Sequence, residues 1–209
     1  MLIVNNKALK ITNKWLNPIA GSGPTPPGPT PPGPTPTLPA YTLRLKFTDG
    51  VTPTFTNGTA TQVSSSPNIW DLTYENEIWY NLLYNQTDLL EVIAAGDTSG
   101  VTNMNCLFQL CTALTTVPLF DTSNVTGMNS MFSDCTSLTN IPLFDTSKVN
   151  QMSGTFAFCW SVQSGALALY NQVSSQTTPP TQHYSTFRDC GVNTTTGAAE
   201  LAQIPSDWK

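Results

Sequence analysis

Charged residues are scarce in this chain of 209 residues: they make up 10% of the sequence, and the net charge is −5. After Lys46 the only cations are Lys148, Arg188 and Lys209. A nucleic-acid binder needs a basic face, because much of its affinity comes from phosphate contacts. We therefore expect no nucleic-acid partner.

Long hydrophobic runs are missing as well. No apolar run approaches the roughly 18 residues of a membrane-spanning helix, so we expect no membrane insertion. The first 18 residues contain lysines but lack the uninterrupted apolar core and small-residue cleavage site of a signal peptide, and no lipobox cysteine is present. The sequence therefore predicts that the chain carries no export signal of its own.

The sequence also lacks the common motifs of catalytic sites. The single histidine, His183, has no carboxylate or cysteine at a recurring catalytic spacing. The chain has no glycine-rich phosphate loop, no histidine-based metal cluster and no nucleophile elbow. We expect no catalytic residues, no cofactor and no metal, and thus a protein that is not an enzyme.

Cysteines are few and odd in number, which argues against a closed disulfide framework. Four of the five follow a phenylalanine by three residues, and these four are Cys111, Cys135, Cys159 and Cys190. This spacing follows a repeat and differs from the paired spacing of a zinc site. We expect buried, reduced thiols that pack as small apolar groups.

An internal repeat is the strongest feature that the sequence does contain. Residues 97–120, DTSGVTNMNCLFQLCTALTTVPLF, are followed at once by DTSNVTGMNSMFSDCTSLTNIPLF at 121–144, which has the same pattern. Equivalent apolar residues are 24 positions apart, as in Met104 and Met128 or Phe108 and Phe132. A period in the range of about 20–29 residues is typical of a leucine-rich-repeat-like solenoid.

Within residues 121–144 two local patterns predict the secondary structure. Four apolar residues recur at i, i+3, i+4 and i+7, which predicts a short helix: Met128, Met131, Phe132 and Cys135. Leu138, Ile141 and Leu143 then alternate with threonine and proline, which predicts a short extended segment with these three residues on one buried face. The expected fold class is an α/β repeat: a leucine-rich-repeat-like solenoid of short parallel strands and short helices, with a small β cap at its N-terminal end and an extended N-terminal tail.

Residues 40–96 are interpreted as the β cap plus a degenerate first repeat. Strict alternation predicts a strand over 40–50, a weaker strand is expected over 51–56, and 68–96 is interpreted as helix followed by strand. Counting back 24 residues places five side chains in the buried register: Tyr80, Tyr84, Thr87, Leu90 and Ile93. Residues 97–209 hold the remaining repeats and a C-terminal cap, with a surface loop at 175–182.

Residues 1–20 form a short apolar block among lysines, and residues 21–39 repeat a Pro-Gly-Pro-Thr-Pro unit. Such a segment is an extended, semi-rigid spacer of ~3 Å per residue. One interpretation of the block is a frayed terminus or an extra strand on its own domain. The layout favours a docking peptide, whose apolar residues are Leu2, Ile3, Val4, Leu9, Ile11, Trp15 and Leu16.

Two further groups of residues are candidates for binding. Trp160 lies at a position that is threonine in the two clear repeats, 97–120 and 121–144, and we expect its side chain to face solvent. We group it with His183 and Tyr184 as a candidate ligand surface. The ladder formed by Asp97, Asp121 and Asp145 could bind calcium at an edge of the repeats. We favour the alternative that these carboxylates form turn and cap hydrogen bonds.

The pattern DTSxVTxMxxMFxxCTSLTxIPLF, over residues 97–170 with a weaker match to 209, resembles BspA-like leucine-rich repeats. This family occurs in bacterial surface proteins and lipoproteins and in structural proteins of tailed phages. The resemblance implies a role in adhesion or display and no catalytic activity.

The resemblance and the layout together imply a structural protein on the exterior of a tailed-phage virion, as a head, collar or tail fibre or decoration. Residues 1–20 would dock on a capsid, collar or tail protein. The repeats would face a host-surface glycan or protein, and several copies would form a homo-oligomer. The alternative is a fragment of a bacterial cell-surface BspA-like adhesin.

Overall fold

The computed structural model describes residues 3–4, 7–8 and 38–209. The chain divides into two compact units, Met1–Thr35 and Pro36–Lys209. In the first unit, β1 (Ile3–Val4) pairs antiparallel with β2 (Lys7–Ala8). All other elements belong to the second unit.

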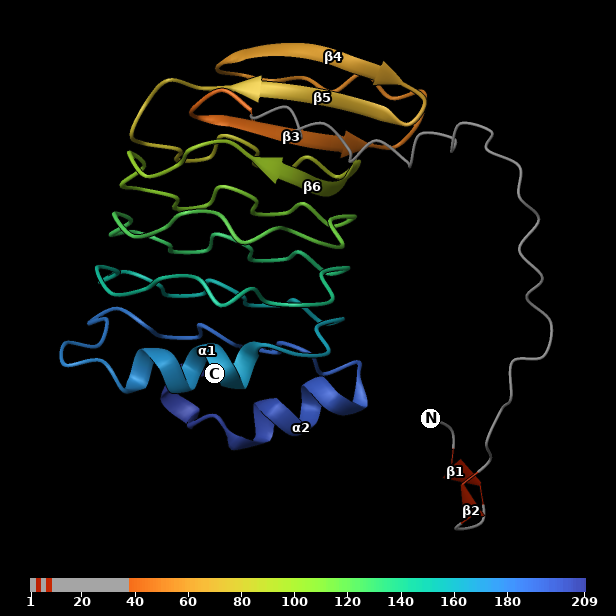
Figure 1. Cartoon of the computed structure of the whole chain (residues 1–209). Coiled ribbons are helices and arrows are strands. Elements are labelled where there is room, and N and C mark those ends of the chain that lie inside the picture. Colours follow the sequence, from red (N-terminus) through yellow and green to blue (C-terminus); the bar gives the residue numbers. More distant parts are fainter. Residues whose placement is uncertain (1–2, 5–6, 9–37) are drawn as a thin grey trace. The chain divides into compact units, whose positions relative to one another are not determined.

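The second unit begins with an antiparallel sheet in the order β4-β5-β3-β6 (Figure 1). Its strands are β3 (Thr42–Phe47), β4 (Thr59–Ser65), β5 (Asn68–Thr73) and β6 (Leu89–Ala95). The alternation predicted over 40–50 produces β3, whose Leu43, Leu45 and Phe47 are buried. The strand expected over 51–56 does not form, and β5 occupies the start of the segment expected to be a helix.

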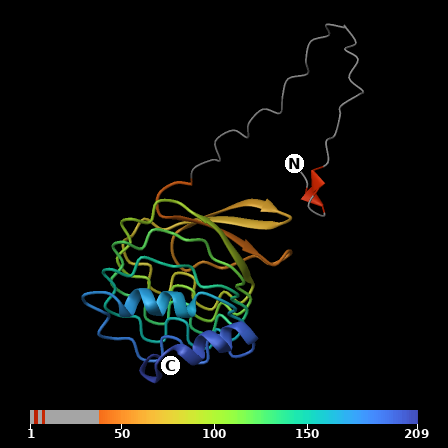
Figure 2. The same cartoon turned by 60° about the horizontal axis from the view of Figure 1, so that its bottom comes forward.

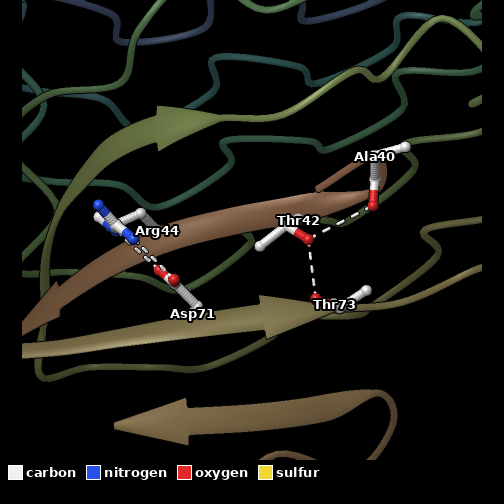
Figure 3. A network of polar contacts seen from close by, with 5 residues as sticks. All are labelled: Ala40, Thr42, Arg44, Asp71 and Thr73. Atoms are coloured by element: carbon white, nitrogen blue, oxygen red, sulfur yellow. Dashed lines mark hydrogen bonds and ion pairs between the residues drawn. The ribbon is translucent and has the colours of Figure 1, made fainter. Parts of the chain in front are cut away.

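Polar groups tie the strands of this sheet together on its other face. Figure 3 shows the guanidinium of Arg44 on β3, which donates two hydrogen bonds of 2.8 Å to the carboxylate of Asp71 on β5. The hydroxyls of Thr42 and Thr73 lie 2.7 Å apart at the end of the same strand pair. The sheet is thus stabilised by apolar packing on one face and by side-chain hydrogen bonds between strands on the other.

Beyond the sheet, each repeat unit forms one turn of the chain, here called a coil, and the coils stack one on another (Figures 1 and 2). Successive coils are joined by isolated parallel bridges, and one column of them is Ile78–Asn103, Asn103–Gly127, Gly127–Gln151 and Gln151–Gln182. β6 joins the sheet to the stack, since its Glu91 forms such a bridge with Thr116.

The fold class expected from the sequence is wrong. The four-stranded sheet of the described residues is antiparallel, and the coils contribute single bridges where parallel strands were expected. Residues 97–144 contain no helix. The described helices lie near the C-terminus: α1 (Ala166–Ser174), α2 (Thr195–Gln203) and a 3-10 turn, η1 (Ser206–Trp208).

Consecutive tight turns take the place of the expected helix over 128–135. Met131 N–H donates to the Met128 carbonyl and Ser133 N–H to that of Ser130, while Ser130 and Asp134 adopt positive φ values of 53° and 63°. Phe132 N–H, between them, donates to a carbonyl of the next coil. In a helix all these amides would donate to carbonyls of the same segment. Here every second amide donates to a carbonyl of the neighbouring coil, so the segment forms turns and not a helix.

Proline prevents a regular parallel sheet from forming at the other side of the coil that holds residues 121–144. Ile141 N–H donates to the Ser164 carbonyl at 3.1 Å, beside a single bridge between Asn140 and Ser164. The next residue is Pro142, which has no N–H to continue a ladder. The expected extended segment is therefore limited to one bridge.

The interior of the stack is a column of aromatic rings. The ring centroids of Phe108 and Phe132 are 5.2 Å apart, those of Phe132 and Phe156 are 5.3 Å apart, and those of Phe156 and Phe187 are 6.0 Å apart. All four side chains are buried. Stacking thus covers the apolar side chains that a single unit would leave exposed.

The first coil is offset from the predicted register by one residue. Trp79 N–H donates to Asn103, and Met104 N–H donates to Gly127, so Trp79 occupies the position of Met104. Trp79 is fully buried, whereas the predicted Tyr80 is 56% exposed and Tyr84 is 45% exposed. The buried apolar residues of this coil are Trp79, Leu82, Leu83, Leu89 and Val92.

The C-terminal elements close the last coil. Thr194 caps α2 by accepting a hydrogen bond from Gly197 N–H at 3.0 Å. The carboxylate of Glu200 on α2 accepts from Leu167 N–H on α1 at 3.1 Å. Ile204 and Trp208 are buried, while the segment 175–182 is mostly exposed.

Candidate functional site

An open groove of about 580 Å³ lies at one corner of the coil stack, beside the C-terminal end of α1. Two coils supply the floor and one rim, and α1 with the residues after it supplies the wall. The residues that define this leucine groove are Leu119, Leu143, Asp121, Asp145, Gln172 and Gln176.

The repeated Pro-Leu-Phe-Asp-Thr sequence builds the floor and rim of the leucine groove. Phe120 and Phe144 point into the core and are 5% and 1% exposed, with their ring centroids 5.1 Å apart. The preceding residues, Leu119 and Leu143, are 65% and 52% exposed. These two coils therefore each contribute one exposed leucine to the groove.

The aspartates of the groove are held by their own turns. The Oδ1 of Asp121 accepts from Ser123 N–H, and that of Asp145 accepts from Ser147 N–H, both at 2.9 Å. The hydrogen bond from the Ser147 amide lowers the pKa of Asp145, helped by the Ser147 side chain. Asp121 and Asp145 are exposed at the rim, so the groove carries two oriented carboxylates.

Asp97 forms the same turn, with Oδ1 accepting from Ser99 N–H at 2.9 Å. These turns are the hydrogen bonds that the favoured interpretation of the aspartate ladder predicted. No group of three or more His, Cys, Asp or Glu side chains gathers in the part of the chain that the structure describes.

The wall of the leucine groove presents amide groups. Gln172 Nε2 donates to the Phe144 carbonyl at 2.7 Å, and Gln176 Nε2 donates to the Thr146 hydroxyl at 2.7 Å. The Oε1 of Gln176 is buried and has no hydrogen-bond partner among residues 38–209. The amide nitrogens of this wall thus hold it to Phe144 and Thr146.

The predicted ligand surface is only partly assembled. The ring of His183 stacks on that of Trp208 at 4.3 Å and lies 5.7 Å from that of Tyr184, which is 68% exposed. His183 Nδ1 is 3.0 Å from the Pro180 carbonyl oxygen, and Nε2 is 3.5 Å from Asp207 Oδ2. This histidine is part of the C-terminal cap.

Trp160 is 40% exposed, as expected of a residue in a solvent-facing turn. Its carbonyl accepts from Asn193 N–H, and no ring contact joins it to His183 or Tyr184 in the described residues. The three candidate residues thus do not form one continuous ring surface.

The predicted docking residues fall mostly outside the described part of the chain. Ile3 and Val4 form β1. Leu2, Leu9, Ile11, Trp15 and Leu16 lie outside the described residues.

The cysteines fill the interior, as the repeat register predicted. All five thiols are free, and Cys111, Cys135, Cys159 and Cys190 are buried. Burial raises the pKa of the Cys111 and Cys190 thiols to about 12. These groups are thus protonated packing elements and poor nucleophiles.

Sequence reasoning missed the leucine groove. Leu143 was assigned to the buried face of a strand, yet it is half exposed, and α1 was not anticipated beside it. The available signal was Pro142, because it interrupts the ladder between Ile141, which is buried, and Leu143, which would share the face of Ile141 in a continuous strand.

A family model described as "Mycoplasma protein of unknown function, DUF285" matches residues 55–179, which is 125 of the 209 residues. The chain belongs to the DUF285 family. The DUF285 match covers the clear repeats and supports the BspA-like part of the resemblance. No curated protein and no solved structure matches the chain. The helices described in this DUF285 member are all too short to span a bilayer.

Proposed function

We propose that this DUF285 chain is a non-enzymatic structural and adhesion protein on the exterior of a tailed-phage particle. Residues 1–20 dock on a capsid, collar or tail protein, and the folded unit is displayed for binding to a host-surface glycan or protein. Several copies form a homo-oligomer on each particle, since multivalency raises the avidity of weak single sites.

The observation that carries this proposal is the order of segments along the chain. An apolar block with three lysines comes first, then a Pro/Gly/Thr repeat, then the compact unit that starts at Pro36. A proline-rich spacer holds the groups at its two ends apart. This arrangement suits a module that is anchored at one end and exposed at the other.

The contacts within the coils also support a scaffold in preference to an enzyme. The hydroxyls of Thr98 and Thr122 donate to the Asp121 and Asp145 carbonyls at 2.8 Å, and buried thiols donate to carbonyls of the preceding coil. These polar side chains hold one coil to the next. Some apolar and aromatic side chains at the surface, such as Leu119, Leu143 and Tyr184, are exposed and free to meet a partner.

Deleting residues 1–20 tests the docking step. Particles assembled with the shortened chain should lack the protein, whereas the full-length chain is retained after gradient purification. A matched control replaces residues 1–20 by a glycine/serine segment of equal length, and it should behave like the deletion. Incorporation of either variant at the normal level contradicts docking by this segment.

A bacterial cell-surface adhesin is the second candidate, favoured by the family description, which names a Mycoplasma protein. The two candidates differ in where the chain resides. Antibody labelling of intact cells without phage supports the adhesin, and labelling of purified particles supports the virion protein.

A further inference from the structure

We propose that the leucine groove binds an extended, basic and aliphatic peptide segment of a protein partner. The biological meaning of this contact rests on the proposed function, in which the folded unit meets a partner. Its chemistry rests on the groove alone, where exposed leucines and two carboxylates line one hollow.

The leucines define the apolar part of the ligand. Leu119 and Leu143 stand one coil apart and are 65% and 52% exposed, while Phe120 and Phe144 close the floor beneath them. An aliphatic pair of this kind accepts a leucine or isoleucine side chain, or the methylene stem of a lysine or arginine. Both kinds of contact remove apolar surface from water.

The charges define the polar part of the ligand. The ionisable side chains that line the groove are Asp121 and Asp145, and both are carboxylates held in fixed turns. Lys148 lies near enough to lower the pKa of Asp145, and its ammonium donates to Asn124 Oδ1. An ammonium or guanidinium group on the ligand complements these carboxylates through charge-assisted hydrogen bonds.

The wall contributes few free donors of its own. The amide nitrogens of Gln172 and Gln176 are already committed to the Phe144 carbonyl and the Thr146 hydroxyl. The acceptors that remain at the groove are the carboxylates of the rim, which N–H groups of a peptide can bind.

A glycan also carries donors, but the apolar surface of the groove suits it less well. Sugar rings stack on the faces of exposed aromatic side chains, and the aromatic residues of this groove are 5% and 1% exposed. The side chains that remain for contact are leucines and carboxylates. A basic aliphatic peptide is therefore the better complement.

Titration calorimetry on the full-length chain tests the proposal. The probe is the acetylated and amidated hexapeptide Leu-Lys-Thr-Leu-Lys-Thr, and matched probes carry glutamine or glutamate in place of both lysines. We expect affinity to fall on the order of fivefold for the glutamine probe and further for the glutamate probe, since two exposed ion pairs are lost. Equal affinity for all three probes overturns the proposal.

Matched substitutions locate the binding. Asp121→Asn with Asp145→Asn keeps the oxygen that accepts from Ser123 and Ser147, so the turns persist while both charges are lost. This double variant should bind the lysine probe about fivefold more weakly. Asp97→Asn makes the same change one coil away, outside the groove, and should leave binding unchanged. An equal loss in Asp97→Asn overturns the assignment.

Two further results separate this inference from the proposed function. Leu143→Gln should weaken the lysine probe while incorporation into particles stays normal, because docking is assigned to residues 1–20. Failure of the peptide to bind, with normal incorporation of the wild-type chain, overturns the groove alone. Tighter binding of an N-acetylglucosamine trimer than of the lysine probe also overturns it and indicates a glycan site.

Discussion

The thiol of Cys135 donates a hydrogen bond from its Sγ to the carbonyl oxygen of Phe108, in the preceding coil, at 3.1 Å. Cys111 bonds to Leu83 and Cys159 to Phe132 in the same way and at the same distance. Each thiol therefore links two coils while packing as an apolar group. The recurrence of cysteine in the repeat is explained by this contact.

Thiol reactivity should follow burial. In the native chain at pH 8, iodoacetamide should modify Cys106 alone, because it is partly exposed while the other four cysteines are buried. Burial also raises the pKa of Cys106, so even this reaction should be slow. Intact-mass measurement should show one adduct in buffer and five in denaturant. Two or more adducts in buffer, without unfolding, contradict the buried assignment.

Stability should fall at alkaline pH. Burial raises the pKa of the Cys111 thiol to about 12 from an ordinary value of 9.0, so between these values the folded chain retains a proton that the unfolded chain loses. The free energy of unfolding should thus be unaffected by this thiol below about pH 8.5 and decrease as the pH rises towards 12. Urea titrations of the wild type and Cys111→Ala measure the effect. The variant should show a shallower decline, and an equal decline contradicts this origin.

Phe132 should be a large contributor to the stack. Its ring lies between those of Phe108 and Phe156 and is fully buried. Phe132→Ala should lower the free energy of unfolding by about 3–5 kcal/mol, and Phe132→Leu by less, because leucine fills more of the cavity. Urea denaturation followed by circular dichroism measures both. Leu119→Ala serves as the exposed control, and equal losses in all three variants argue against the ring column.

The register of the first coil can be tested with two neighbouring aromatic residues. Trp79 is fully buried and Tyr80 is 56% exposed. Trp79→Ala should lower the free energy of unfolding by about 3–5 kcal/mol, while Tyr80→Ala should change it by about 0.5 kcal/mol or less. The reverse order of effects supports the register predicted from the sequence and contradicts the structure.

The C-terminal cap should control fraying of the last coil. Trp208 stacks on His183 and packs against Phe187 at a ring-centroid distance of 6.4 Å. Trp208→Ala should therefore speed hydrogen exchange in residues 183–190 far more than in residues 121–144. Tyr184→Ala, which removes a 68% exposed ring, is the matched control and should leave both segments protected. Uniform exchange across the two segments contradicts a local capping role.

The buried columns of the repeat were predictable from the sequence, but the backbone between them was not. Met128, Phe132 and Leu138 are buried as their 24-residue recurrence predicted. The spacing of three and four residues among Met128, Met131, Phe132 and Cys135 fits a helix and also fits a run of tight turns. The choice depends on whether alternate amides, such as that of Phe132, find acceptors in the next coil, which is a non-local property.

The register of the first coil and the formation of the leucine groove also depend on tertiary contacts. Trp79 and Tyr80 are adjacent aromatics, so composition alone did not decide which one faces the core. Leu143 lies in an apolar run, and its exposure follows from Pro142 and from the position of α1. A sequence-derived list of buried residues therefore succeeded in the clear repeats and failed where a repeat is irregular or ends.

Imaging of purified particles decides whether this chain is a virion protein. Particles from a lysate of the host that carries this gene should be purified and imaged by cryo-electron microscopy, with an antibody against residues 40–209 to mark the chain. We expect antibody density on the outer surface of the head, collar or tail, separated from the particle by a thin spacer. Unlabelled particles, together with antibody on the surface of phage-free cells, would contradict the virion assignment.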